Sequence, residues 1–286
     1  MPASVRETTA FIAHDAAFWR LFQQVGPSLR VVAEDIASDG NSFHEAGVWS
    51  DQAEALFFTS NRRTAERGRA YTALSKMEFG RRGGGSGVWR DLSRDEYPYP
   101  TPNGGTILPN GNVLVCDQGR DEDNHLSSLV VVDPTGRRRP RCVLNNYQLL
   151  PFNSLNDVVV VPSAVSSGSR RRGEHRPDGD DHNDDQAELG LDDGEVILFT
   201  DPSYGHEQGF KQEPVLPNQV YGFFPQTGEV RVMADGFVKP NGIVVDEQRR
   251  KCYITDTGYI RGDGQFDGTR PGTMYVATLP FPASSR

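Results

Sequence analysis

Four oxygen-bearing side chains recur at one point of a repeated pattern and could together bind a metal ion. In each copy this side chain precedes an apolar run, and a turn then leads to a second apolar run that ends in Thr, Asp or Ser. The four residues are Glu45, Asn103, Asn156 and Asn241. Carboxylate and amide oxygens are the ligands that hard cations prefer. Arranged around one axis, these oxygens would form a site for calcium or another divalent cation.

The spacing of this pattern predicts the elements that position the four side chains. Each copy corresponds to two short strands, at 45–49 and 56–60, 103–107 and 113–117, 156–160 and 196–201, and 241–245 and 253–256. The copies begin about 50 to 85 residues apart, and periods of this order are typical of propeller blades. We therefore predict an all-β fold in which residues 1–286 form a single β-propeller domain.

Composition narrows the classes of partner. A formal net charge of −9 argues against general nucleic-acid binding, which requires a basic surface. Three cysteines are an odd number in a chain of 286 residues, which favours buried free thiols over a disulfide framework. The sequence shows neither a signal-like apolar segment nor an apolar run long enough to span a membrane. We expect a cytoplasmic protein with no membrane partner, and the oligomeric state stays open.

Two segments depart from the strand pattern. Apolar residues within 10–24 recur at helical spacing, which predicts a short helical extension within residues 1–30. Residues 163–193 are rich in Ser, Arg, Asp and His and interrupt the third repeat, so we expect a disordered insertion there. The acidic run 178–185 inside it does not fit a calcium-binding EF-hand loop, because position 12 of that loop would be Leu189. We interpret this run as a solvated acidic loop.

Several short motifs together resemble a known family. They occur in the expected order, and the resemblance covers about residues 40–280. The motifs are His44-Glu45-Ala46-Gly47, Asn103-Gly104-Gly105-Thr106, Cys116-Asp117-Gln118-Gly119, Leu155-Asn156-Asp157, Asp201-Pro202-Ser203-Tyr204-Gly205 and Pro240-Asn241-Gly242. The sequence resembles the gluconolactonase, senescence-marker-protein and luciferin-regenerating-enzyme-like family of six-bladed propellers. The similarity is strongest to the fungal and bacterial lactonase branch.

The resemblance implies a function and a set of site residues. It implies a calcium-dependent hydrolase that opens small-molecule lactones, with the cation in the central tunnel. Carried over to this sequence, the metal ligands are Glu45, Asn156 and Asn241. Asn103 is the implied substrate-binding residue, and Tyr204 is expected to anchor a loop that shapes the mouth of the tunnel on the substrate side. Each residue also has a plainer explanation, since Asn before Gly is common in turns and a single Glu is usually a surface charge.

The sequence also departs from the family. The family has a further Asp ligand, in a turn about 45 to 60 residues after the second Asn, and no residue here matches it. Asp263 and Asp267 come too early, so the catalytic residue is unassigned. We count about four of six blades and expect an incomplete six-bladed propeller with little or no lactonase activity. The alternatives are a phosphotriesterase-like hydrolase on the same propeller, and an inactive truncated paralogue or binding scaffold.

His44, beside Glu45, has two interpretations. A histidine next to a metal-binding glutamate could relay protons. Such a residue more often packs against a strand or caps it, and we favour this structural role.

Overall fold

The computed structural model describes residues 7–8, 29–35, 42–65, 68–80, 87–161, 189–191, 194–246, 250–258 and 273–278. The predicted helix within 10–24 lies outside the described residues, as do Asp263 and Asp267. Most of the predicted insertion 163–193 lies outside them as well.

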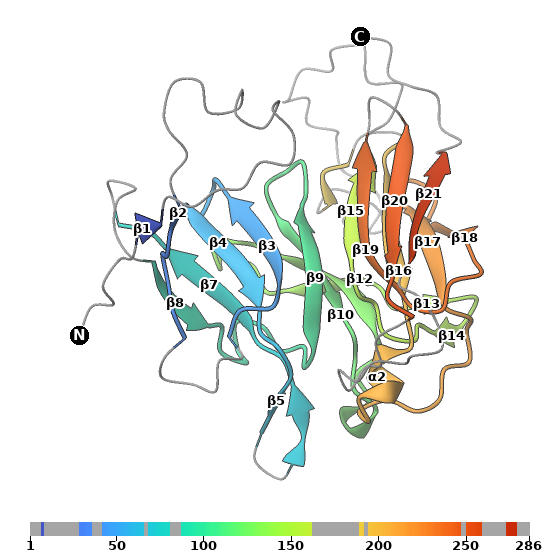
Figure 1. Cartoon of the computed structure of the whole chain (residues 1–286), viewed down its shortest axis with the longest axis horizontal. Helices are drawn as coiled ribbons and strands as arrows, with labels where there is room; N and C mark the ends of the chain where they lie inside the picture. The colour runs from blue at the N-terminus through green and yellow to red at the C-terminus, as the bar shows by residue number, and fades with distance from the viewer. Residues whose placement is uncertain are drawn as a thin grey trace, which may run out of the picture.

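Four antiparallel sheets form the body of the described structure, each a propeller blade (Figure 1). Blade 1 contains β3 (Glu45–Ser50), β4 (Ala55–Thr59), β7 (Leu74–Glu78) and β8 (Val88–Asp91). Blade 2 contains β9 (Pro102–Ile107), β10 (Val113–Asp117), β11 (Ser128–Val132) and β12 (Arg141–Leu144). Blade 3 contains β15 (Val158–Val161), β16 (Val196–Asp201), β17 (Gln219–Phe224) and β18 (Glu229–Ala234). Blade 4 contains β19 (Pro240–Asp246), β20 (Lys251–Asp256) and β21 (Thr273–Thr278), which confirms the predicted all-β propeller with four blades.

The remaining elements are short. Three two-stranded pairs are β1 (Glu7–Thr8) with β2 (Leu29–Arg30), β5 (Arg63–Thr64) with β6 (Ala70–Tyr71), and β13 (Asn146–Tyr147) with β14 (Leu150–Pro151). The described helices are η3 (Asp121–Asp123) and α2 (Tyr204–Glu207).

The apolar core fills the spaces between neighbouring blades. One cluster joins blades 1 and 2 through residues such as Phe57 and Val115. A larger cluster joins blades 2 and 3, and Phe152, Phe199 and Tyr221 contact one another within it. Leu189 is buried in this larger cluster although it belongs to the predicted insertion. An apolar residue near the end of the polar run therefore packs into the core, and the predicted extent of the insertion stays a prediction.

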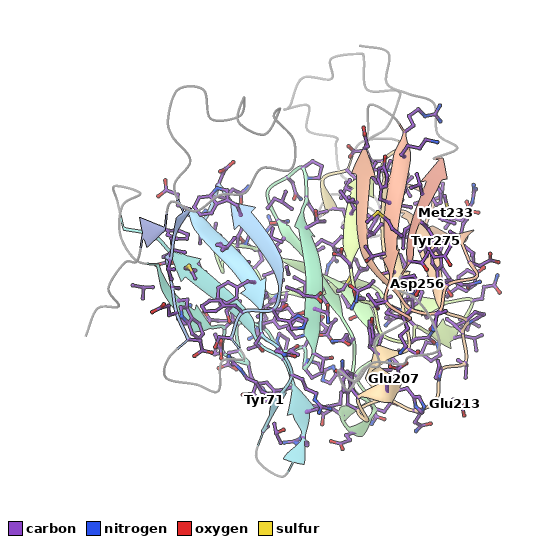
Figure 2. All side chains as sticks on the ribbon, in the orientation of Figure 1. Tyr71, Glu207, Glu213, Met233, Asp256 and Tyr275 are labelled. Carbon is purple, nitrogen blue, oxygen red and sulfur yellow. The ribbon has the colours of Figure 1, made fainter. Side chains whose placement is uncertain are left out.

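A buried aspartate at the end of the second strand fixes the inner strand of three blades. Asp117 accepts hydrogen bonds from the backbone N–H groups of Thr101 and Gly119. Asp201 accepts from the backbone N–H groups of 153 and 154. Asp256, whose place in the fold is labelled in Figure 2, accepts from the backbone N–H groups of 238 and 239. The Asp that ends these strand patterns therefore has a structural role, because it holds the loop that leads into the inner strand.

The cysteines are free thiols, as the odd count predicts. Cys116 and Cys252 are buried, whereas Cys142 is only half-buried.

Candidate functional site

The predicted site residues lie at a β-bulge that begins the innermost strand of each blade. In blade 2, Asn103 and Gly104 together lie opposite Cys116. In blade 4, Asn241 and Gly242 lie opposite Thr255. Bulges of this kind redirect a side chain and are frequent beside functional sites.

Blade 3 has the same local arrangement. The backbone N–H of Asn156 donates to the carbonyl of Thr200, and the N–H of Thr200 donates to the carbonyl of Asp157. Two residues of the inner strand therefore lie opposite one residue of its neighbour here as well.

In blade 1 the predicted site residue lies one position earlier, relative to the bulge, than in the other blades. There Ala46 and Gly47 form the bulge opposite Phe58, and Glu45 pairs with Thr59 just before it. Glu45 is thus one position earlier than the three asparagines, which corrects the exact equivalence that the sequence suggested.

Asp157 connects the bulges of neighbouring blades. One carboxylate oxygen accepts from the N–H of Val158 at 2.9 Å, and the other accepts from the N–H of Ile243 in blade 4 at 3.0 Å. On the other side, the N–H of Gly104 in blade 2 donates to the carbonyl of Asn156 at 2.8 Å. The starts of β9, β15 and β19 therefore meet around Asn156 and Asp157.

Glu45 belongs to the same electrostatic environment. Burial raises the pKa of its carboxyl to about 7, and the negative charge of Asp157 contributes to the rise. Burial also raises the pKa of Asp157, and the two backbone N–H donors oppose that rise. Two partly buried carboxylates that repel each other are a favourable setting for a cation, which removes the repulsion when it binds.

Two amide oxygens at the site have no partner. Within the part of the chain that the structure describes, the buried Oδ1 atoms of Asn103 and Asn156 accept no hydrogen bond. Leaving a buried acceptor unsatisfied costs about 1–3 kcal/mol, so a native protein usually pairs such atoms with water, an ion or a ligand. Both oxygens are therefore available for a cation or a bound molecule.

Tyr204 anchors α2 to the start of β19. Its hydroxyl accepts from the amide Nδ2 of Asn241 at 3.1 Å and is hydrogen-bonded to the hydroxyl of Thr257. Because the nitrogen of the Asn241 side chain is engaged in this way, the orientation of its Oδ1 is fixed too. An ion pair of 2.9 Å between Lys239 and Glu207 joins the same helix and strand. Tyr204 thus lies where the sequence predicted a loop anchor.

His44 contacts Glu45 directly. Its ring Nδ1 lies 3.4 Å from Oε1 of Glu45, and its backbone N–H donates to the carbonyl of Thr59. Burial lowers the pKa of His44 while that of Glu45 is raised. The opposite directions of the two shifts argue for a polar contact rather than a full ion pair.

The donor set fits a hard divalent cation. Glu45, Asn156 and Asn241 offer one carboxylate and two amide oxygens, and Asp157 adds a second negative charge beside them. No group of three His, Cys, Asp or Glu side chains that could hold a metal ion occurs among the described residues. A cation site built from the described residues would use amide oxygens beside the carboxylates, and such a donor set suits calcium better than zinc. Asp157 is not among the site residues predicted from the sequence, although the Asn156-Asp157 pair was visible as a motif.

The close approach of blades 2 and 3 gives a prediction for Gly104. A Cβ atom at this position would lie 2.4 Å from the carbonyl oxygen of Asn156 and 2.7 Å from Oδ1 of Asp157. Gly104→Ala should therefore push β9 away from the site and lower the free energy of unfolding by about 1–3 kcal/mol, measured by urea denaturation. Gly80→Ala is the matched control, because a Cβ there meets nothing within 4 Å. Equal stability of the two variants would contradict this packing.

Comparisons with known proteins agree with this fold. No family model matches the chain. A stretch of 72 residues, 25% of this chain, is 35% identical to the lactonohydrolase OryL of Aspergillus oryzae and spans 16% of that protein. A gluconolactonase structure from Xanthomonas campestris aligns over 90% of this chain and 67% of its own length, with a TM-score of 0.56 and 18% identity. The predicted resemblance to gluconolactonase-type propellers is thus confirmed at the level of the fold.

The described helices also bear on the membrane question. None of them is both long enough and apolar enough to cross a bilayer.

Proposed function

We propose that this protein is a divalent-cation-dependent lactone hydrolase, with calcium as the expected cation. The observation that carries the proposal is the pair of partnerless buried oxygens, on Asn103 and Asn156, beside the repelling carboxylates of Glu45 and Asp157. The similarity to a lactonohydrolase and to a gluconolactonase structure supports the choice of lactones as substrates.

In this proposal each site residue has a separate role. Glu45, Asn156 and Asn241 would hold the cation, which when bound acts as a Lewis acid toward the lactone carbonyl. Asn103 can donate from its amide nitrogen to a substrate oxygen and so orient the ring. The hydrogen bond from the N–H of the next residue, Gly104, to the carbonyl of Asn156 supports this role.

Asp157 supplies a second carboxylate beside Glu45, the only carboxylate among the site residues predicted from the sequence. Each of its oxygens accepts one backbone N–H, which fixes the group and leaves further lone pairs for a water molecule. We assign it the role of general base: it takes a proton from water as the water oxygen bonds to the carbonyl carbon. The ring C–O bond then breaks, and the released alkoxide takes the proton back from Asp157, which gives the hydroxy acid and restores the carboxylate.

Lactone hydrolysis tests this proposal. Purified protein is incubated with an aldonolactone in calcium and in excess chelator, and acid release is measured. We expect turnover that chelation removes and calcium restores. The absence of calcium-dependent turnover would contradict the proposal and favour the binding-scaffold alternative. Paraoxon in the same assay separates a lactonase from a phosphotriesterase-like enzyme.

A substitution at Tyr204 tests whether its hydroxyl orients the Asn241 side chain for calcium binding. Tyr204→Phe keeps the ring but removes the hydroxyl that holds the Asn241 amide. Calcium affinity should fall about 10- to 100-fold, as is typical when a group that orients a metal ligand is lost. Calorimetric titration measures this effect directly. Tyr253→Phe, on the neighbouring β20, is the control and should bind calcium as the wild type does. An unchanged affinity in Tyr204→Phe would show that this hydroxyl does not orient a ligand.

A further inference from the structure

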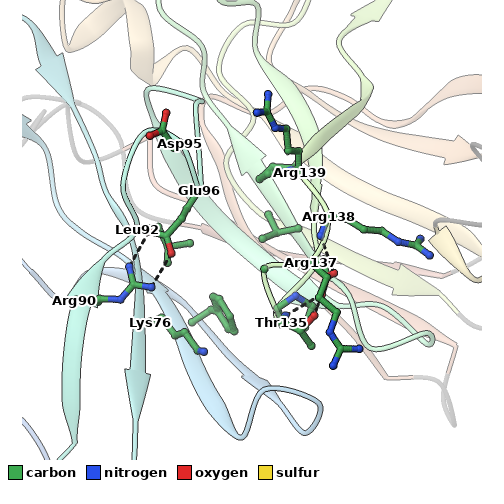
Figure 3. A pocket seen from close by; sticks show the side chains of 15 residues that line it. Lys76, Arg90, Leu92, Asp95, Glu96, Thr135, Arg137, Arg138 and Arg139 are labelled. Atoms are coloured by element: carbon green, nitrogen blue, oxygen red, sulfur yellow. Dashed lines mark hydrogen bonds and ion pairs between the residues drawn. The ribbon is translucent and has the colours of Figure 1, made fainter.

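A pocket lies between blades 1 and 2, away from the candidate functional site (Figure 3). Its volume is about 410 Å³, within the range of about 300–1,000 Å³ that is usual for small-molecule sites. Buried or half-buried apolar side chains contribute to its lining, among them Phe57, Leu92 and Val132. The pocket therefore offers contact to an apolar body as well as to polar groups.

The charge of this pocket is opposite to that of the whole protein. The lining includes five cationic residues and three carboxylates, so its formal charge is +2 in a chain of net charge −9. The cationic residues are Lys76, Arg90, Arg137, Arg138 and Arg139, and the carboxylates are Asp95, Glu96 and Asp133.

Two of the three carboxylates, Glu96 and Asp133, interact with neighbouring groups of the protein. Glu96 pairs with Arg90 at 2.7 Å, which holds the pKa of Glu96 at about 2. Asp133 accepts from the N–H groups of Thr135 and Arg138 and from the hydroxyl of Thr135. These bonds shape the turn between β11 and β12, which carries three consecutive arginines.

The three arginines of this turn are available to bind an anion. The guanidinium groups of Arg137, Arg138 and Arg139 are exposed, and no ion pair or hydrogen bond joins them to any other described residue. Figure 3 shows the turn that carries them across the pocket from Arg90 and Glu96, with the three side chains extending in different directions. A guanidinium presents a planar set of N–H donors that matches the oxygens of a phosphate group.

We infer that this pocket binds a phosphorylated small molecule, whose phosphate is held by arginines of the β11–β12 turn and whose ring or apolar body packs on Phe57, Leu92 and Val132. This inference goes beyond the proposed lactone hydrolysis and does not depend on it. The pocket uses outer strands and the β11–β12 turn. By the strand register, this turn leaves blade 2 at the end opposite to Asn103, since Val132 and Ile107 both pair with Val113.

Binding of simple probes tests the inference. Calorimetric titrations use 1-naphthyl phosphate, 1-naphthol and inorganic phosphate with the full-length protein. We expect 1-naphthyl phosphate to bind more tightly than either other probe, and less tightly as salt concentration rises. The variant with Arg137→Gln, Arg138→Gln and Arg139→Gln should weaken binding about tenfold, because exposed ion pairs are each modest but three are removed. Lactone hydrolysis should not change in this variant.

Arg94→Gln provides the matched control, because Arg94 is an exposed arginine of the neighbouring blade 1 that does not line this pocket. It should bind 1-naphthyl phosphate as the wild type does. Equal binding by the triple variant, or equal binding of 1-naphthol, would overturn the inference. Preferential binding of a duplex oligonucleotide that the same three substitutions abolish would also overturn it, in favour of a nucleic-acid surface.

Discussion

Replacing Glu45 with Gln should weaken calcium binding about 100-fold or more. This effect is larger than that of losing a group that only orients a metal ligand, which is typically about 10- to 100-fold. The substitution keeps the length of the side chain and one oxygen but removes the only carboxylate among the three proposed ligands. Hydrolysis of a lactone should fall with it. Calorimetric titration with calcium and acid release from an aldonolactone are the two measurements.

The same substitution should not unfold the protein. Glu45 and Asp157 repel each other in the absence of a cation, so removing one charge should leave the calcium-free protein as stable as before, or more so. Glu54→Gln serves as the control, since Glu54 is exposed in the turn that follows β3. Wild-type calcium affinity in Glu45→Gln would remove Glu45 from the site.

Replacing Asp201 with Ala should produce the largest loss of stability. The carboxylate is fully buried and accepts from the N–H groups of Asn153 at 3.0 Å and Ser154 at 2.8 Å. Alanine would leave both buried donors without an acceptor, which should lower the free energy of unfolding by about 3–5 kcal/mol. Urea denaturation measures the change, with the exposed Asp235→Ala as control. A loss below that of the control would show that Asp201 does not fix the loop.

Asp201 and Asp117 also predict a dependence of stability on pH. Burial raises the pKa of Asp201 to about 7 and that of Asp117 to about 6, so the folded protein binds protons that the unfolded chain has released. Their contribution to stability is complete below the unfolded pKa of about 4 and is lost as pH rises through 6 to 7. The calcium-free protein should therefore be more stable at pH 5 than at pH 8. A rise in stability over this range would contradict the stated directions.

Some of this structure could be predicted because it depends on local chemistry. Apolar runs bounded by Gly, Asn and Asp are sufficient to locate the first two strands of each blade, and they also mark where Asn103, Asn156 and Asn241 lie. The one-residue offset of Glu45 could not be found in this way. It depends on which residue of β3 pairs with Thr59, and strand register is fixed by tertiary packing.

Other features required the blades to be placed side by side. Asp157 is connected to Ile243 and lies beside Gly104, and these contacts join three blades that are far apart in the sequence. Leu189 shows the limit of composition, because one apolar residue in a polar run can still pack into the core. The three arginines of the β11–β12 turn had no visible significance until the facing wall from blade 1 was known.

The most direct measurement of the central claim is a crystal structure of the protein grown in calcium. The account predicts one ion at the start of the inner strands, with oxygen atoms of Glu45, Asn156 and Asn241 at about 2.3–2.6 Å from it. Asn103 should lie beside this ion on the side open to substrate. Well-ordered bulges without an ion between them, or calcium bound only elsewhere in the chain, would contradict the account.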